Sequence, residues 1–113
     1  MPSLSALSIY VFGISAFLAG IYNLLNPQSS LAAMDLPIAA LPSHCGNALA
    51  AIAMGIYYML AAYQRNKTFF MLTVPMRLLT ATVFWSQGGK WKVAGTWEGG
   101  GALVTAVALL LNL

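Results

Sequence analysis

Charged residues are scarce in this sequence. Only 6% of its 113 residues are Asp, Glu, Lys or Arg, whereas 60% are hydrophobic. A soluble domain carries roughly 25% charged residues, so this chain has too few to cover a surface that faces water. The bilayer is therefore the better solvent, and the length allows four spans of about 20 residues with short connections.

Cysteine and histidine each occur once, as Cys45 and His44. A single cysteine cannot form an internal disulfide, and these two neighbouring residues cannot by themselves complete a metal site. We therefore expect neither a metal nor another cofactor. The five basic residues are spread singly along the chain, which gives no footprint for nucleic acid, although the net charge of +3 suits an anionic membrane surface.

Four apolar segments are predicted to span the membrane as helices. They cover residues 4–25, 46–63, 68–85 and 93–113, and they are separated by Pro27, by the Arg65–Lys67 turn and by Gly88–Gly89. The first segment has no basic residues before it and is too long for the apolar part of a signal peptide, so we expect it to be retained.

These segments predict an all-α membrane protein with one domain, residues 1–113, built as a four-transmembrane-helix bundle with both termini on one side. We expect an integral, multi-pass protein, located in the endoplasmic reticulum if its source is eukaryotic. Two basic residues on each side of the membrane leave the orientation undecided.

The segment between the first two spans, residues 28–43, differs from an ordinary loop. It contains LAAMDLPIAALP, in which Asp35 stands between two apolar turns and prolines occupy positions 37 and 42. Such a segment is predicted to lie at the membrane interface or to re-enter the membrane, where protein must cover its backbone. Asp35 is then either a site residue or a solvated interfacial residue or helix cap.

One arginine and one glutamate lie inside the predicted spans. Arg77 is in the middle of the third span, and Glu98 is five residues into the fourth. An ionisable residue at membrane depth is costly and normally paired, so we expect direct or one-water contact between these two side chains. The pair either marks a functional site or only fixes the packing of the third span on the fourth.

More polar residues gather on one side of the predicted bundle than a single ion pair requires. The connections that follow the first and third spans lie on the same side, and this half holds both acids, the histidine, Arg77 and two asparagines. We therefore expect a functional site there. Asp35, Arg77 and Glu98 are the candidate catalytic residues. The candidate substrate-binding residues are Asn47, Tyr58, His44, Tyr22 and Trp97.

Several short motifs together resemble a small four-helix membrane-protein family found in bacteria and fungi, most of whose members have no assigned function. They are NP at 26–27, GN at 46–47, the small-residue stretch to Gly55, Arg77, and EGGGAL at 98–103. Some small multi-span fungal proteins act in biosynthetic pathways, where they cyclise terpenoids or open epoxides. The resemblance therefore implies an activity in secondary metabolism by analogy of fold.

The residue types favour an enzyme that opens an epoxide of a lipophilic small molecule, by hydrolysis or cyclisation. One carboxyl protonates the ring oxygen, the other takes a proton from water or an internal hydroxyl, and arginine holds both. The arrangement resembles the Asp–Arg–Asp centre of limonene-epoxide hydrolases in chemistry alone. We expect Glu98 to be the base and Asp35 the acid, or the reverse, because unequal surroundings let two carboxyls hold different protonation states.

Two other classes of function remain open. The chain could be a binding or transport subunit that passes a small anion or lipid past Arg77. It could also be a structural partner, in which Gly95 and Gly99 of the last span face outward and dock onto another membrane protein. A homodimer through such small-residue faces is a further expectation.

Overall fold

The computed structural model describes residues 3–113, and this part of the chain is entirely helical, with no strand. In chain order its elements are α1 (Leu4–Leu25), α2 (Pro27–Ala33), the short 3-10 helix η1 (Ile38–Ala40), α3 (Leu41–Tyr63), α4 (Lys67–Gln87) and α5 (Trp91–Leu110). The four long helices are each long and apolar enough to cross a membrane. The predicted all-α fold with four candidate spans is confirmed.

Local sequence signals account for several helix ends. The Ser3 hydroxyl accepts a hydrogen bond from the Ala6 backbone N–H at the start of α1, and the Asn66 side chain caps α4 in the same way through Phe69. Between α4 and α5, Gly88 and Gly89 both adopt positive φ angles, which glycine tolerates without steric cost.

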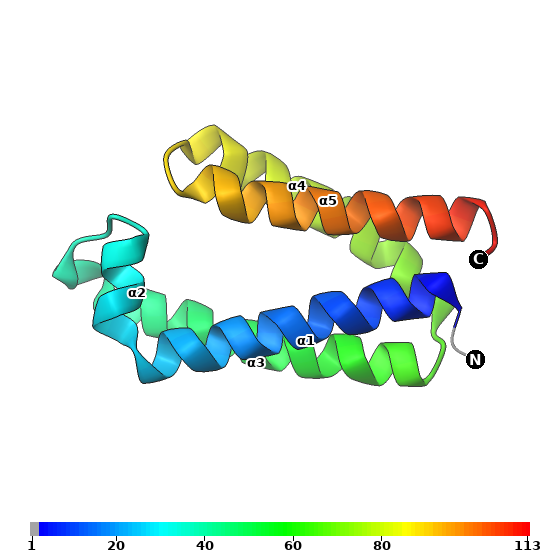
Figure 1. Cartoon of the computed structure of the whole chain (residues 1–113), viewed down its shortest axis with the longest axis horizontal. Coiled ribbons are helices and arrows are strands. Elements are labelled where there is room, and N and C mark those ends of the chain that lie inside the picture. Colours follow the sequence, from blue (N-terminus) through cyan, green and yellow to red (C-terminus); the bar gives the residue numbers. More distant parts are fainter. Residues whose placement is uncertain (1–2) are drawn as a thin grey trace.

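The long helices form two antiparallel pairs, which Figure 1 shows one above the other. In one pair α1 packs along α3, and in the other α4 packs along α5. The pairs meet at the end of the molecule that carries both termini. There the Ser5 backbone N–H donates to the Leu113 carbonyl at 3.3 Å, and the Ser8 and Thr105 hydroxyls share a hydrogen bond of 2.7 Å. Both termini therefore lie at the same end of the bundle, as predicted.

Glycines allow the backbones within the α1/α3 pair to approach closely. A Cβ atom on Gly55 would lie 2.6 Å from the Gly13 carbonyl oxygen, and one on Gly20 would lie 2.7 Å from the Ala48 carbonyl oxygen. No real side chain fits at such distances, so these positions need glycine for packing.

Two glycines of α5 lie against α4, its partner helix. A Cβ on Gly95 would lie 3.1 Å from the Ala81 carbonyl oxygen of α4, and one on Gly99 would lie 3.4 Å from the Ala81 Cβ. Gly95 is buried against α4, so the expectation that it faces outward to dock another protein is wrong, whereas Gly99 is half-buried. A homodimer remains a prediction.

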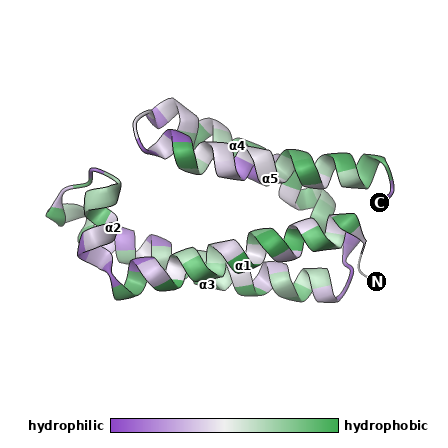
Figure 2. Ribbon diagram, in the orientation of Figure 1, coloured by the Kyte–Doolittle hydropathy of each residue, from purple (hydrophilic) through white to green (hydrophobic). Residues whose placement is uncertain are grey.

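The apolar core lies where the two pairs meet, and Figure 2 shows hydrophobic residues concentrated along the terminal halves of α1 and α5. Its buried members are Ala6, Ile9, Phe12, Tyr58, Ala61, Ala62 and Phe70. Large apolar side chains such as Leu18, Leu79 and Leu103 are exposed. Such a surface suits hydrocarbon rather than water, which supports a multi-pass membrane protein.

The connection between α1 and α3 is more helical than predicted. α2 and η1 occupy part of the predicted interfacial segment, and α3 begins at Leu41, five residues before the predicted span. Pro42 does not prevent this early start, because the first turn of a helix has no use for the missing N–H. α4 likewise continues through Pro75.

Candidate functional site

A cavity of about 460 Å³ lies between the two helix pairs. Each of the four long helices contributes to its wall, and so does Met34 at the end of α2. This volume falls in the range of roughly 300–1,000 Å³ that holds small organic ligands. The polar residues of the wall are Asn23, His44, Asn47, Tyr58, Arg77, Thr80 and Glu98.

Arg77 is almost completely buried, with 2% of its surface exposed. Its Nη2 donates to the Thr73 hydroxyl at 3.0 Å, and its Nε donates to the Thr73 carbonyl at 3.4 Å. The guanidinium carbon lies 4.8 Å from the centre of the Phe12 ring and 5.9 Å from that of Tyr58. Aromatic faces stabilise a cation at such distances. The Arg77 charge is therefore stabilised by Thr73 of its own helix and by two aromatic rings.

One nitrogen of this guanidinium has no partner. Nη1 is buried and makes no hydrogen bond with any residue of the described chain. A buried donor left without an acceptor costs free energy, and in native sites it commonly marks the place of a ligand or a water. Arg77 lines the cavity, although Nη1 itself has almost no surface exposed to it.

Glu98 lines the same cavity and is 6% exposed. It forms no ion pair with Arg77, because no guanidinium nitrogen lies within 4.0 Å of a Glu98 carboxylate oxygen. The expected direct contact is therefore absent, and a contact through one water stays a prediction. Both side chains belong to residues that line the same cavity.

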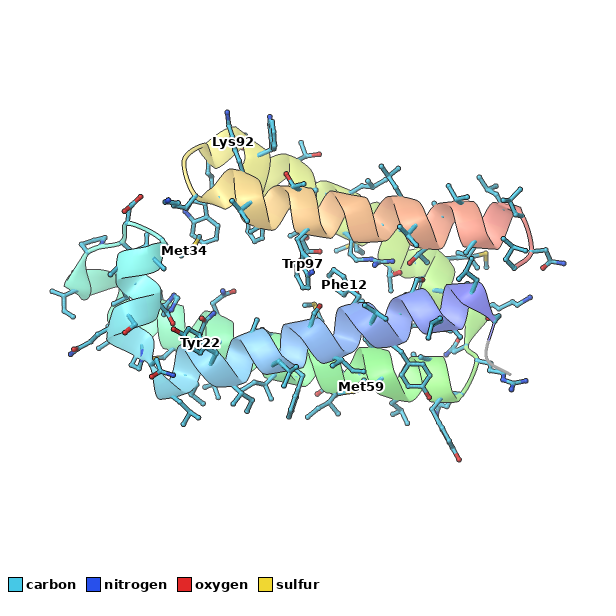
Figure 3. All side chains as sticks on the ribbon, in the orientation of Figure 1. Phe12, Tyr22, Met34, Met59, Lys92 and Trp97 are labelled. Atoms are coloured by element: carbon cyan, nitrogen blue, oxygen red, sulfur yellow. The ribbon has the colours of Figure 1, made fainter. Side chains whose placement is uncertain are left out.

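The cavity extends along the bundle away from Arg77. Tyr58, beside Arg77, is fourteen residues after His44 on α3, which corresponds to about 20 Å along the helix axis. His44 therefore lies towards the α2 end, and its Nε2 is a second buried atom without a partner. Figure 3 shows Met34 at that end and the Phe12 and Trp97 side chains between the two pairs. The cavity thus has polar groups both at its outer end and near the middle of the bundle.

Six of the eight predicted site residues line this one cavity, namely His44, Asn47, Tyr58, Arg77, Trp97 and Glu98. The structure does not bring Asp35 or Tyr22 to it. Asp35 is exposed, in a left-handed conformation with φ 56° just after α2, and Tyr22 is 56% exposed. Asp35 therefore does not share the cavity wall with Arg77 and Glu98, because the turn that ends α2 leaves it exposed outside that wall.

Three aromatic residues at the site were not predicted. Phe12 lies against the Arg77 guanidinium, and Trp91 and Phe84 line the cavity with their rings 5.1 Å apart. Phe12 gave no signal among the other apolar residues of α1. Within residues 3–113 no three His, Cys, Asp or Glu side chains cluster as metal ligands would.

Together, four long apolar helices and a partly polar cavity between them define a small four-span membrane protein. Comparisons of the chain with family models, curated proteins and solved structures gave no match. The resemblance to a small four-helix membrane family therefore stays a prediction.

Proposed function

We propose that this protein is a membrane-embedded enzyme that opens an epoxide of a lipophilic small molecule held between the two helix pairs. The observation that carries the proposal is the buried, unpartnered Nη1 of Arg77, a residue that lines the same cavity as Glu98. An epoxide oxygen can accept a hydrogen bond from Nη1, and the Glu98 carboxylate can accept the proton that is released when the ring opens.

Asp35 lies outside the cavity, so the proton donor must be another group. Tyr58 lines the cavity beside Arg77, since its ring centre is 5.9 Å from the guanidinium carbon, whereas the closer Thr73 hydroxyl is not part of the cavity wall. It is buried and lines the cavity. Burial disfavours a tyrosinate at Tyr58, and the adjacent guanidinium offsets part of that cost, so Arg77 assists Tyr58 in the acid role.

The proposed reaction balances with water as the only co-substrate. The Tyr58 hydroxyl gives its proton to the epoxide oxygen as one carbon–oxygen bond breaks, and Arg77 holds that oxygen. Water attacks the carbon, and the Glu98 carboxylate takes the proton that the water loses. The product is a diol, and a proton passes from Glu98 back to Tyr58 to restore the starting state. If an internal hydroxyl replaces water, the product is a cyclic ether.

The test uses the two acids of the chain as a matched pair. Purified protein in lipid nanodiscs is incubated with a panel of lipophilic epoxides in isotope-labelled water, and the products are analysed by mass spectrometry. Glu98→Gln should lower turnover by about 10²-fold or more, because the base is lost. Asp35→Asn makes the same chemical change outside the cavity and should leave turnover within about twofold. Full activity of Glu98→Gln would refute the proposal.

A binding protein without turnover is the second candidate. The observation that favours it is the position of Asp35, which leaves Glu98 as the only carboxylate of the described chain in the cavity wall. Binding needs only the donors of Arg77 and His44 and the apolar wall. Saturable binding of a lipophilic epoxide without product formation by the wild-type protein would support this candidate.

A further inference from the structure

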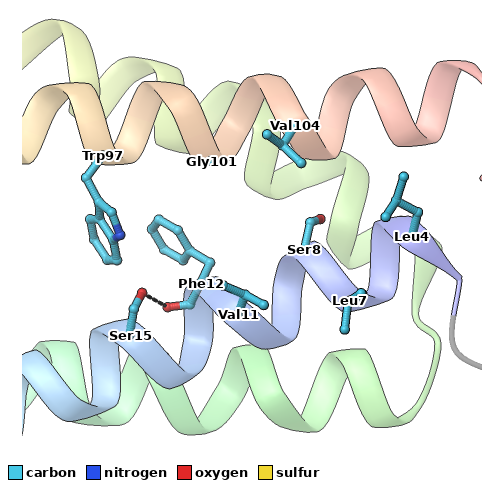
Figure 4. Close-up of a pocket in the computed structure, with 9 residues that line it drawn as sticks. All are labelled: Leu4, Leu7, Ser8, Val11, Phe12, Ser15, Trp97, Gly101 and Val104. Carbon is cyan, nitrogen blue, oxygen red and sulfur yellow. Dashed lines mark hydrogen bonds between the residues drawn. The ribbon is translucent and has the colours of Figure 1, made fainter.

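A second hollow lies on the outside of the bundle, in the groove between α1 and α5 (Figure 4). Its volume is about 390 Å³, and its wall is apolar apart from two serines. Both serine hydroxyls already have partners. Ser8 bonds to the Ser5 carbonyl and to the Thr105 hydroxyl, and Ser15 donates to the Phe12 carbonyl. The groove is therefore almost entirely apolar, which suits a hydrocarbon chain.

The inner end of this groove adjoins the polar cavity. Trp97 lines both hollows, and its ring is stacked on Phe12 with the ring centres 4.2 Å apart. Phe12 lines the groove and also lies against the Arg77 guanidinium. Two stacked rings are thus the partition between the groove and the arginine.

Gly101 brings the unpartnered nitrogen of Arg77 up to this partition. It lines the groove, and a Cβ at this position would lie 3.3 Å from Nη1 and 3.0 Å from an edge carbon of Phe12. The missing side chain of Gly101 leaves Nη1 next to the groove wall. A molecule whose oxygen binds Nη1 can therefore leave its hydrocarbon part in the groove.

We propose that the groove between α1 and α5 is a second binding subsite, which holds the hydrocarbon chain of the same molecule whose oxygen binds Arg77. The inference rests on the proposed function for the polar end of that molecule, and it adds that the substrate is a long-chain amphipathic compound. Because the groove is on the outside of the bundle, the compound reaches it sideways from the bilayer, and the Trp97 ring moves aside to admit the polar end.

The test follows the fluorescence of Trp97 in a protein where Trp85 and Trp91 are replaced by phenylalanine. The probe is dibrominated stearic acid added to nanodiscs of unbrominated phosphatidylcholine, since bromine quenches tryptophan only at short range. We expect quenching of Trp97 that saturates at a low proportion of the probe. Quenching that only rises in proportion to the probe would show that Trp97 meets bulk lipid, and this would overturn the proposal.

Two valines of α5 provide a matched pair of variants. Val104 lines the groove and Val107 does not, although both are about half exposed, at 55% and 51%. Val104→Phe should fill the groove and weaken the affinity for the probe, measured from saturable quenching, by about tenfold or more. Val107→Phe should leave this affinity within about twofold of the wild-type value. Equal effects of the two substitutions would overturn the assignment of the groove.

The link to the polar cavity is tested with Arg77→Met. In this assay the carboxylate of the stearic acid probe takes the place of the substrate oxygen at Arg77. Loss of the charged donor should therefore weaken the binding of the probe by about tenfold. Unchanged saturable quenching would overturn the claim that one molecule occupies both places. Failure of the proposed function has a different signature, since saturable quenching would persist while no epoxide is turned over.

Discussion

The separation of Arg77 from Glu98 gives a quantitative prediction about their coupling. Two unit charges about 4 Å apart attract by about 4 kcal/mol at an effective dielectric constant of about 20, and by about 2 kcal/mol at about 8 Å. The two groups are farther apart than 4.0 Å and line one cavity. We therefore expect a coupling free energy below about 4 kcal/mol. If the two groups formed a closed buried ion pair, removal of one partner would instead lower the free energy of unfolding by about 3–5 kcal/mol.

The other contacts of Arg77 set the cost of removing it alone. Arg77→Met loses the bonds to Thr73 and the attraction of the Phe12 and Tyr58 rings. Hydrogen bonds within membrane proteins average about 0.6 kcal/mol each, and a cation–aromatic contact contributes about 0.5–2 kcal/mol. Removal of a buried charge offsets part of this loss. The substitution should lower the free energy of unfolding by about 2 kcal/mol or less.

A double-mutant cycle measures the coupling directly. Wild type, Arg77→Met, Glu98→Gln and the double variant are unfolded by dodecyl sulfate in mixed micelles, and the free energies are compared at one pH. Glu98→Gln keeps the size of the side chain, so its effect reports mainly the charge. A coupling of about 4 kcal/mol or more would mean that the two groups form a closed ion pair. The guanidinium would then not be free to hold a ligand.

Two further predictions concern packing and the proposed acid. Gly55→Ala should destabilise the protein by about 1–3 kcal/mol in the same unfolding assay, because its Cβ meets the backbone of α1. Gly100→Ala is the control: no atom lies within 4 Å of its Cβ, so it should be neutral or slightly stabilising, and equal losses for both variants would contradict this account. Tyr58→Phe should fold normally, because the ring contacts remain, but turn over epoxides about 10²-fold more slowly. Unchanged turnover would remove Tyr58 from the acid role.

The four long helices could be predicted because their signal is local. Each predicted span has enough apolar residues for a bilayer, and breakers such as Pro27 and Gly88 separate them. The positions of Arg77 and Glu98 inside the third and fourth spans could also be read from the sequence, and both side chains are buried. The start of α3 was missed because a proline in a first helical turn looks like a break from sequence alone.

The site was predicted less completely, because it depends on how separate helices meet. Helix direction and depth correctly placed six residues along one cavity. They could not place Asp35, whose position depends on the turn after α2, or Tyr22, which faces away from the cavity. Phe12 carries no periodic or chemical mark in α1, so its contact with Arg77 emerges only from the packing of α1 against α4 and α5.

The cavity exists because glycines lie at the contacts within each helix pair, whereas aromatic rings lie between the two pairs. Within each pair, glycines such as Gly55 and Gly95 bring two backbones together and leave no space between them. Between the pairs, the rings of Phe12, Tyr58 and Trp97 act as spacers, with Phe12 in contact with the other two. Because the Phe12 and Tyr58 rings also stabilise the Arg77 charge, the guanidinium does not need Glu98 as a direct partner. The rings that hold the pairs apart thus leave an unpartnered donor and a carboxylate on two residues of one cavity wall.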